Sequence, residues 1–328
     1  MTRNFSQHFH DAIIKMNFTG QRWVVLGAGG FIGTNLCVRL VQNGANVVAF
    51  GRSLGFARAL TGCQWVVGDF FNPRDLANIL EGADIVVHAL STVTPAKSNE
   101  SPINDIEENL IGTLRLLELC KTKGVARLVF LSSGGTVYGP DVSVPTVEDE
   151  ANEPICSYGV VKLAIEKYLA IYRQQQQLDS VVLRVANPFG PYQLPKGQGV
   201  IAATIQKVLM GQPPEIWGDG NVVRDYIYID DVIDAILAAA QLDGSQAPRL
   251  YNIGSGVGKS LNEVVNGIAE IHGAIHIKRL PGRAVDVPVS ILNIQRAERF
   301  LNWRPHTDWK LGLRLTYSWF ERFGLFNA

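Results

Sequence analysis

A glycine-rich turn near the N-terminus constrains the fold of this chain more than any other feature. The segment Gly27-Ala-Gly-Gly30-Phe31-Ile32-Gly33 follows the short apolar run 23–26 and leads directly into an amphipathic pattern. Glycines in such a turn allow a tight bend, close packing of helix on strand, and approach of an anion to main-chain N–H groups. Because strand, turn and helix stand in the required order, the segment predicts a binding site for the pyrophosphate of a dinucleotide.

Alternation of strands and helices continues to residue 185. Short runs rich in β-branched residues are separated by amphipathic stretches, a pattern typical of βαβ units that feed one parallel sheet. The predicted strands are 23–26, 46–50, 64–67, 84–89, 128–132 and 180–185, and the predicted helices are 32–43, 74–80, 106–122 and 158–176. Six strands with helical crossovers predict an α/β fold with a doubly wound parallel sheet, the Rossmann arrangement.

The regular alternation of strands and helices ends after residue 185. Proline and glycine clusters at 187–191, 212–214 and 281–283 punctuate shorter segments, as expected of a smaller C-terminal α/β part that binds substrate. We therefore predict an N-terminal extension over 1–21 and a dinucleotide-binding domain over 22–186, to which segments around 223–255 return. Residues 187–328 would then form mainly the substrate-binding part.

Composition excludes several other classes of protein. The 30 Lys and Arg residues balance 30 Asp and Glu residues, which argues against nucleic-acid binding, because that binding relies on a cationic surface. No apolar run approaches the roughly 18 residues of a membrane span, and residues 1–20 lack a secretory signal. The four cysteines, Cys37, Cys63, Cys120 and Cys156, show no C-x-x-C spacing. We expect a cytoplasmic protein with reduced thiols and no metal site.

The end of the second predicted strand bears on the choice of cofactor. An acidic residue at this place usually receives the ribose 2′-hydroxyl of NAD, but the sequence reads Phe50-Gly51-Arg52-Ser53. Loss of the carboxylate removes repulsion toward a 2′-phosphate, with which Arg52 and Ser53 could pair. Alternatively, Arg52 stacks on adenine or faces solvent. The sequence favours NADP over NAD, with Asp69 as a candidate contact to the adenine.

Tyr158 and Lys162 stand four residues apart at the predicted start of a helix, which places both side chains on one face. A phenol has a pKa near 10, so its action as a base near neutral pH requires positive charge nearby to lower that pKa. The lysine ammonium group and a nicotinamide cation would provide it. Tyr158 would exchange a proton with a substrate hydroxyl, and Lys162 would also hold the nicotinamide ribose. This pattern also occurs on ordinary helices, but the preceding glycine turn favours the catalytic interpretation.

A second glycine string, residues 254–260, superficially suggests an ATP-binding loop. The P-loop pattern would require glycine at position 253, where the chain has Ile253. We instead predict a turn followed by a helix, with Ser260 and Glu263 forming a capping box.

With these motifs in order, the chain resembles the extended short-chain dehydrogenase/reductase superfamily, and within it the nucleotide-sugar epimerase/dehydratase family. Further segments carry the resemblance from about residue 22 onward: Val87-His-Ala89, Asn109-Leu-Ile-Gly-Thr113, Arg184-Val-Ala-Asn-Pro-Phe-Gly190, Val223-Arg-Asp-Tyr-Ile227 and Leu301-Asn-Trp-Arg304. The resemblance implies further cofactor contacts at Phe31, Ile32, Phe70, Ala89, Leu90 and Asn109. It also implies a homodimer that pairs through two helices of each subunit.

The resemblance also implies the residues that bind a nucleotide-sugar, most simply a UDP-linked one. Asn187 and Arg224 would approach the substrate diphosphate, supported by the guanidinium fork of Arg283. Alternatively, Arg283 is a solvated surface charge. Asp286 would contact the substrate ribose. Trp217 would flank the nucleobase or, alternatively, belong to the core, and the other implied contacts are Gly199 and Val200.

One departure from the family pattern concerns catalysis. Gly134 stands four residues before Tyr138, where the family carries its catalytic serine or threonine. The hydroxyl that bonds to the reacting sugar oxygen must then come from Ser133 or Thr136, or be missing.

The same segment separates the possible reactions. Family dehydratases carry an acid and a carboxylate directly after the catalytic hydroxyl, but this chain has Gly135 and Thr136 there. The preferred function is therefore C4 epimerisation of a UDP-hexose through a transient 4-keto intermediate, of the kind that serves polysaccharide biosynthesis. The alternatives are an NADPH-dependent reductase of a nucleotide-linked 4-keto sugar and a non-catalytic dinucleotide-binding protein.

Overall fold

A seven-stranded parallel sheet forms the centre of the molecule, in the order β10-β6-β5-β4-β1-β2-β3. The computed structural model describes residues 16–53, 55–56, 59–176, 178–195, 199–243, 246–282 and 287–324. The strands are β1 (Arg22–Leu26), β2 (Asn46–Gly51), β3 (Gln64–Val67), β4 (Ile85–His88), β5 (Arg127–Ser133), β6 (Ser180–Val185) and β10 (Leu250–Ile253). The predicted doubly wound sheet is confirmed. Its direction of winding reverses between β1 and β4, so a crevice forms at the carboxyl ends of these strands.

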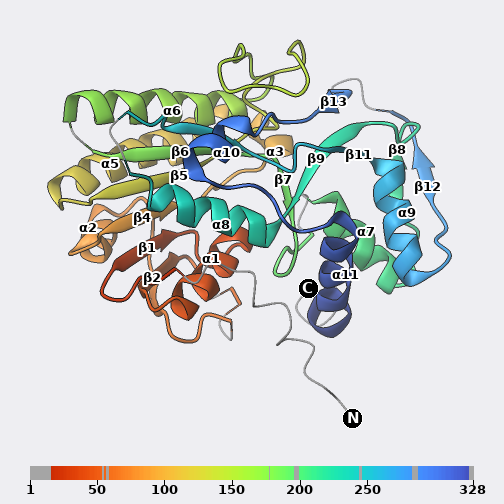
Figure 1. Cartoon of the computed structure of the whole chain (residues 1–328), viewed down its shortest axis with the longest axis horizontal. Helices are drawn as coiled ribbons and strands as arrows, with labels where there is room; N and C mark the ends of the chain where they lie inside the picture. The colour runs from red at the N-terminus through yellow and green to blue at the C-terminus, as the bar shows by residue number, and fades with distance from the viewer. Residues whose placement is uncertain are drawn as a thin grey trace.

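Helices cover both faces of this sheet (Figure 1). One face carries α1 (Phe31–Gln42) and α8 (Ile229–Ala240), and the other carries α2 (Pro73–Leu80), α5 (Gly112–Thr122) and α6 (Ser157–Gln176). Alternate residues of a strand point to opposite faces, so Val25 packs in the core beneath α1 and α8, and Val24 packs in the core beneath α2, α5 and α6. Both faces being covered explains why the strands are almost continuously apolar.

The helix predicted over 106–122 is interrupted in the structure. The short helices α3 (Pro95–Ser98) and α4 (Pro102–Asp105) come first, then the π-helix η1 (Ile106–Ile111), and α5 begins only at Gly112. The side-chain hydroxyl of Thr113 donates a hydrogen bond to the carbonyl oxygen of Asn109 at 2.6 Å. Apolar periodicity predicted a helix but could not reveal the wider turn. Such π-turns recur at functional sites.

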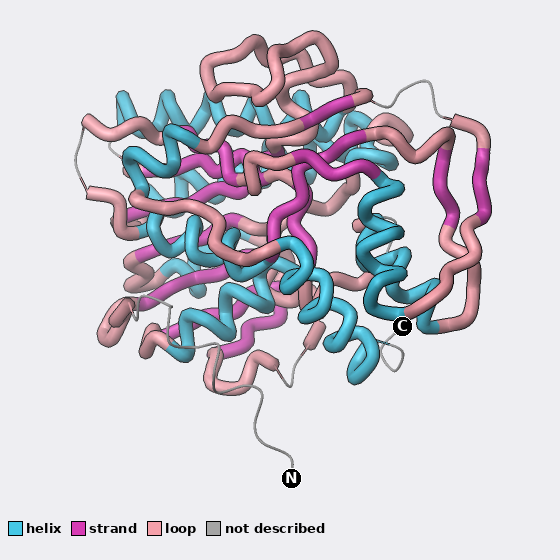
Figure 2. The backbone as a smooth tube through the Cα atoms, turned by 45° about the vertical axis from the view of Figure 1, so that its right-hand side comes forward, coloured by secondary structure: helices cyan, strands magenta, loops and turns pink. Residues whose placement is uncertain are grey.

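The second part of the molecule lies beyond one end of the sheet (Figure 2). Its strands are β7 (Asn187–Phe189), β8 (Glu215–Trp217), β9 (Val223–Tyr228), β11 (Gly258–Ser260), β12 (Lys278–Leu280) and β13 (Val289–Ser290), and its helices are α7 (Val200–Leu209), α9 (Leu261–His272), α10 (Gln295–Leu301), α11 (Trp309–Trp319) and η2 (Phe320–Gly324). The strand β9 pairs with β7, β11 and β13. The predicted capping box of Ser260 and Glu263 begins α9. Within the described ranges, no helix is both long and apolar enough to cross a membrane.

Candidate active site

The glycine turn brings backbone against backbone between β1 and α1. Gly27 has φ +84°, and a Cβ added there would lie 2.9 Å from the carbonyl oxygen of Ala89. A Cβ on Gly33 would lie 2.3 Å from the carbonyl oxygen of Gly27. The first N–H groups of α1, at Phe31 and Ile32, have no acceptor within their own helix. The turn therefore fits a pyrophosphate, because no side chain obstructs the approach to these donors.

A small pocket continues the crevice past the end of β2. Its lining includes Gly51, Arg52, Asp69, Phe70 and Leu90. Arg52 and Asp69 are exposed at its rim, whereas Phe70 is buried beneath it. The Asp69 carboxylate accepts a hydrogen bond from the N–H of Phe71 at 3.0 Å, which fixes its direction. The pocket has the position expected for the adenosine of a dinucleotide.

Ser53 and Asn109 are among the predicted cofactor contacts that lie outside the lining of this pocket. The backbone of Ser53 packs against Gly29, and its side chain is exposed. The amide of Asn109 is 7% exposed and bonds to Thr92, which does line the pocket. Asn109 therefore supports the pocket wall.

Tyr158 and Lys162 lie together on the inner face of α6, as their spacing predicts. The Lys162 ammonium group is 5.5 Å from the centre of the Tyr158 ring and 4.6 Å from that of Phe130. It donates a hydrogen bond to the carbonyl oxygen of Leu131 at 2.8 Å. Burial lowers the pKa of Lys162 to about 8, although the carboxylates of Glu166 and Asp105 oppose this effect.

The expected lowering of the Tyr158 pKa is not a property of the chain alone. Burial raises the pKa of the phenol, and the negative charges of Cys156 and Asp105 raise it further. Cys156 lies only two residues before Tyr158, whereas Asp105 comes from a distant segment that the sequence did not link to this pair. Ionisation of Tyr158 near neutral pH would therefore require further positive charge, such as that of the nicotinamide expected from the sequence.

The three positions considered for the catalytic hydroxyl differ in their surroundings. A Cβ on Gly134 would lie 2.5 Å from Cδ1 of Leu292, so Leu292 fills the space of a larger side chain there. Ser133 ends β5 and is half-buried. The Thr136 hydroxyl is buried and has no hydrogen-bond partner among the described residues. Its carbonyl oxygen lies against Gly159, beside Tyr158, since a Cβ on Gly159 would be 2.4 Å away from it.

Behind the Tyr–Lys pair lies a buried ionic network that sequence patterns did not reveal. Arg184, 1% exposed, donates to both carboxylate oxygens of Glu166, and its shortest bond measures 2.6 Å. Ser132 also donates to Glu166. The network joins β5 and β6 to α6 one turn beyond Lys162. Arg184 and Glu166 lie on separate predicted elements, and only the folded structure shows that they form an ion pair.

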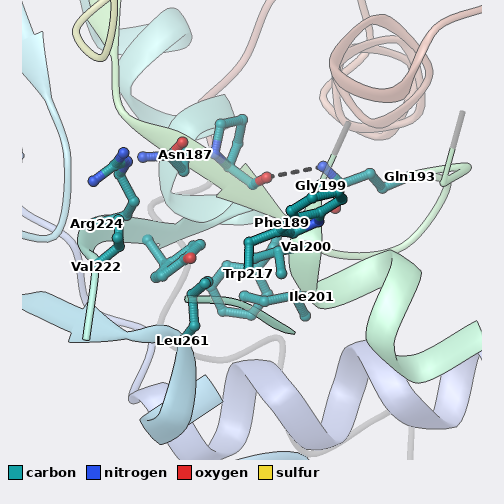
Figure 3. A pocket seen from close by; sticks show the side chains of 12 residues that line it. Asn187, Phe189, Gln193, Gly199, Val200, Ile201, Trp217, Val222, Arg224 and Leu261 are labelled. Atoms are coloured by element: carbon teal, nitrogen blue, oxygen red, sulfur yellow. Dashed lines mark hydrogen bonds between the residues drawn. The ribbon is translucent and has the colours of Figure 1, made fainter. Parts of the chain in front are cut away.

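A second cavity, of about 290 Å³, opens in the C-terminal part of the molecule (Figure 3). It is lined by Asn187, Gly199, Val200, Trp217 and Arg224, which were all predicted, together with Pro188, Phe189, Gln193, Ile201, Val222, Tyr226 and Leu261. Trp217 is 37% exposed, so it forms part of the wall and not of the core. The predicted residues Arg283 and Asp286 lie outside the described residues.

Polar groups in this cavity are held by backbone oxygens. Arg224 Nη1 donates to the carbonyl oxygen of Val287 at 2.6 Å, and Asn187 Nδ2 donates to that of Asp225 at 2.9 Å. The amide nitrogen of Gln193 donates to Pro188 at 3.1 Å, across the cavity from Arg224 in Figure 3. The cavity thus presents a fixed cation to an anionic ligand, an arrangement suited to a diphosphate. Among the described residues, no group of three or more His, Cys, Asp or Glu side chains could hold a metal ion.

A dinucleotide crevice that meets a Tyr–Lys pair on the following sheet helix defines an extended short-chain dehydrogenase/reductase. The sequence matches the NAD-dependent epimerase/dehydratase family over residues 23–254. The chain therefore belongs to that family.

Individual relatives are similar along almost the whole chain. The UDP-glucose 4-epimerase of Mycolicibacterium smegmatis is 34% identical over 311 residues, which cover 92% of this chain and 98% of that protein. The crystal structure of the Thermotoga maritima UDP-glucose 4-epimerase with UDP-glucose has a TM-score of 0.87 and 34% identity, covering 92% and 99%. The Thermus thermophilus UDP-glucose 4-epimerase complex with NAD has a TM-score of 0.83 and 32% identity, covering 92% and 99%.

Proposed function

We propose that this protein is a nucleotide-sugar 4-epimerase that inverts C4 of a UDP-hexose through a transient 4-keto intermediate. The single observation that carries the proposal is the meeting of Tyr158 and Lys162 on one face of α6. The names of its relatives support the choice of UDP-glucose as the first substrate to test. Gly135 and Thr136, which replace the two acidic groups of a dehydratase, argue against loss of water.

In this mechanism, Tyr158 removes the proton of the C4 hydroxyl and later returns it. The nicotinamide, when bound, supplies reversible oxidation of that alcohol. Lys162 favours the phenolate by its charge and also holds the nicotinamide ribose. Arg224 and Asn187 retain the diphosphate while the keto sugar turns its other face to the nicotinamide. No further acid is needed, because each proton that leaves returns to the same oxygen.

We propose that Thr136, and not Ser133, supplies the hydroxyl that bonds to the reacting oxygen. Its buried hydroxyl has no partner among the described residues, and an unsatisfied polar group of this kind is costly unless it has a function. Replacement by Val keeps the shape and removes the donor, so Thr136→Val should lower kcat by about 10²-fold. Ser133→Ala is the matched comparison and should retain most activity. The opposite order would assign the role to Ser133.

Proton NMR of the anomeric signals tests the epimerase directly. The protein is incubated with NAD or NADP and with UDP-glucose, UDP-galactose or their N-acetyl counterparts. We expect the C4 epimer to appear without net change in the cofactor, and Tyr158→Phe to abolish its formation. Failure of all four sugars with both cofactors would overturn the UDP-hexose proposal.

We further propose that the cofactor pocket favours NADP over NAD. Arg52 lies at the rim of this pocket, and no carboxylate ends β2. NADP should then raise the melting temperature more than NAD at equal concentration. Arg52→Ala should remove that difference but keep stabilisation by NAD. Equal stabilisation of the unaltered protein by the two cofactors would contradict this preference.

A reductase is the second candidate, because Arg52 would suit the 2′-phosphate of NADPH, the cofactor that such a reductase consumes. It would reduce a nucleotide-linked 4-keto sugar with NADPH. Loss of NADPH absorbance upon addition of such a sugar, with no epimerisation in the NMR experiment, would favour the reductase.

We also propose a cytoplasmic homodimer. Large apolar side chains are exposed along the outer surface of α6, namely Val160, Tyr168 and Ile171, and beside them Ile103, Ile106 and Ile111 on α4 and η1. We call these six residues the apolar stripe. A second copy of the chain would cover it. The four cysteines are free, in keeping with a reducing compartment.

A further inference from the structure

Asp105 is a fully buried carboxylate next to the candidate catalytic pair. It ends α4, at the point where the π-turn η1 begins, and its exposed fraction is 0%. Oδ1 accepts a hydrogen bond from Asn109 Nδ2 at 2.9 Å, and Oδ2 accepts one from Ser157 Oγ at 2.8 Å. Both partners are neutral. A buried charge held only by neutral groups is costly, so this carboxylate requires an explanation.

The two partners of Asp105 belong to opposite sides of the active site. Asn109 bonds to the backbone N–H of Thr92 at 3.1 Å and to its hydroxyl at 2.9 Å, and Thr92 lines the candidate adenosine pocket. Ser157 is the first residue of α6 and directly precedes Tyr158. Its N–H is held separately, by Asn99 Oδ1 at 2.8 Å. Asp105 therefore connects the wall of the cofactor pocket to the start of the catalytic helix.

The carboxylate also acts on the pair through its charge. Its negative charge raises the pKa of both Tyr158 and Lys162. The other titratable groups that act on this pair or respond to it are Cys156 ahead of α6, Glu166 on α6 and His88 on β4. Together with Glu166, Asp105 opposes the effect of burial on Lys162, and it makes the Tyr158 phenolate a stronger base.

We propose that Asp105 is a positioning residue that orients Tyr158 through Ser157, couples it to the cofactor wall through Asn109, and places a buried negative charge beside the Tyr–Lys pair. The proposal rests on the proposed catalytic roles of Tyr158 and Lys162.

The test is Asp105→Asn, which removes the charge and keeps the size and the ability to bond to both neighbours. A negative charge favours the protonated form of each group, so its removal lowers both pKa values. Both limbs of the pH profile of kcat/KM should therefore move to lower pH, by roughly one pH unit. Ser157→Ala is the matched control: it breaks one hydrogen bond but keeps the charge, so kcat should fall with both limbs in place. Unmoved limbs in a folded Asp105→Asn protein would overturn the proposal.

A second measurement separates this inference from the proposed function. The protein is labelled with ¹³C at the Tyr ring carbon that bears the hydroxyl and saturated with NAD, with no sugar present. The Tyr158 signal is assigned by its loss in Tyr158→Phe. We expect it to titrate at lower pH in Asp105→Asn than in the unaltered chain. If no sugar is epimerised but the titration still shifts, the proposed function fails and the inference stands. If the titration is unchanged, the inference fails. Asp105→Ser is the neutral substitute if Asp105→Asn does not fold.

Discussion

Lys162 carries its charge inside the protein, with few partners to compensate for lost hydration. Its ammonium group has one carbonyl acceptor, on Leu131, and two ring faces nearby. Burial lowers its pKa, and the carboxylates of Glu166 and Asp105 oppose that change. Both the charged and the neutral form of Lys162 are therefore populated near pH 8. Its protonation can be measured as a property of the site.

The rate of epimerisation should fall as pH rises through about 8, because the pKa of Lys162 is lowered to about 8 and the proposed mechanism uses its charged form. The measurement is kcat as a function of pH between about pH 6 and pH 10, a range that covers the protonated and the neutral form of Lys162. Lys162→Arg stays charged throughout that range. This control should have a lower rate but no decline near pH 8, and an unchanged decline would assign it to another group.

Gly134 shows how a neighbour far along the chain decides what one position tolerates. A Cβ there would meet Leu292 at 2.5 Å and the carbonyl oxygen of Arg184 at 3.1 Å. Gly135, the next residue, has no atom within 4 Å of an added Cβ. The two adjacent glycines thus differ in available space, a difference invisible in the sequence.

Gly134→Ser should destabilise the protein by about 1–3 kcal/mol, the usual cost of overpacking. Gly135→Ser should leave stability nearly unchanged. Urea unfolding measures both. Adding Leu292→Ala to Gly134→Ser should cost less than the sum of the two single changes, because the space vacated by one admits the other. Strict additivity would show that Leu292 is not the obstacle.

At the level of elements, the helix α6 is anchored to the sheet by charge as well as by apolar packing. Its Glu166 is 6% exposed and pairs with Arg184 on β6, which is 1% exposed. Val161 and Ile165, on the same helix, pack in the core cluster that covers this face. The ion pair therefore helps to fix the position of α6 relative to β6. It also helps to fix the positions of Tyr158 and Lys162 relative to the sheet.

Arg184→Met should lower the free energy of unfolding by about 3–5 kcal/mol, because it leaves Glu166 charged and buried without its partner. Guanidinium unfolding followed by circular dichroism measures the loss. The control is Lys310→Met, which removes an exposed ion pair with Glu270; surface pairs contribute little. A similar small change in both variants would mean that the buried pair contributes no more than a surface pair.

For the whole molecule, the apolar stripe on α6, α4 and η1 lies on the face of the sheet away from α1 and α8. The cofactor crevice lies at the carboxyl ends of the strands, so pairing of two chains through the stripe would leave both crevices open. The stripe also lies next to Asp105 and Tyr158 in the chain, so a dimer would support the segment that holds the candidate catalytic pair.

Val160→Glu should convert the protein from dimer to monomer, because it would bury a carboxylate without a partner in the interface. Sedimentation velocity measures the state. Val67→Glu is the matched control, since Val67 is 61% exposed on the edge strand β3, away from the stripe. A monomer in the unaltered protein, or a dimer that survives Val160→Glu, would contradict the proposed interface.

The sequence by itself determined what depends on neighbours within a few residues. The glycine turn, the six predicted strands, the capping box at Ser260 and the shared face of Tyr158 and Lys162 all follow from local periodicity or spacing. Membership of a nucleotide-sugar family could be inferred from the same motifs.

Only the tertiary structure decided what depends on segments far apart in the chain. The strand β10 was not predicted, because its four residues gain their stability from pairing with β6. The contact of Gly134 with Leu292, the ion pair under α6 and the bridge from Asp105 to Ser157 likewise cross long stretches of sequence. Burial gives these pairs their strength, because charges and hydrogen bonds act more strongly where water is excluded, and burial is a property of the folded molecule.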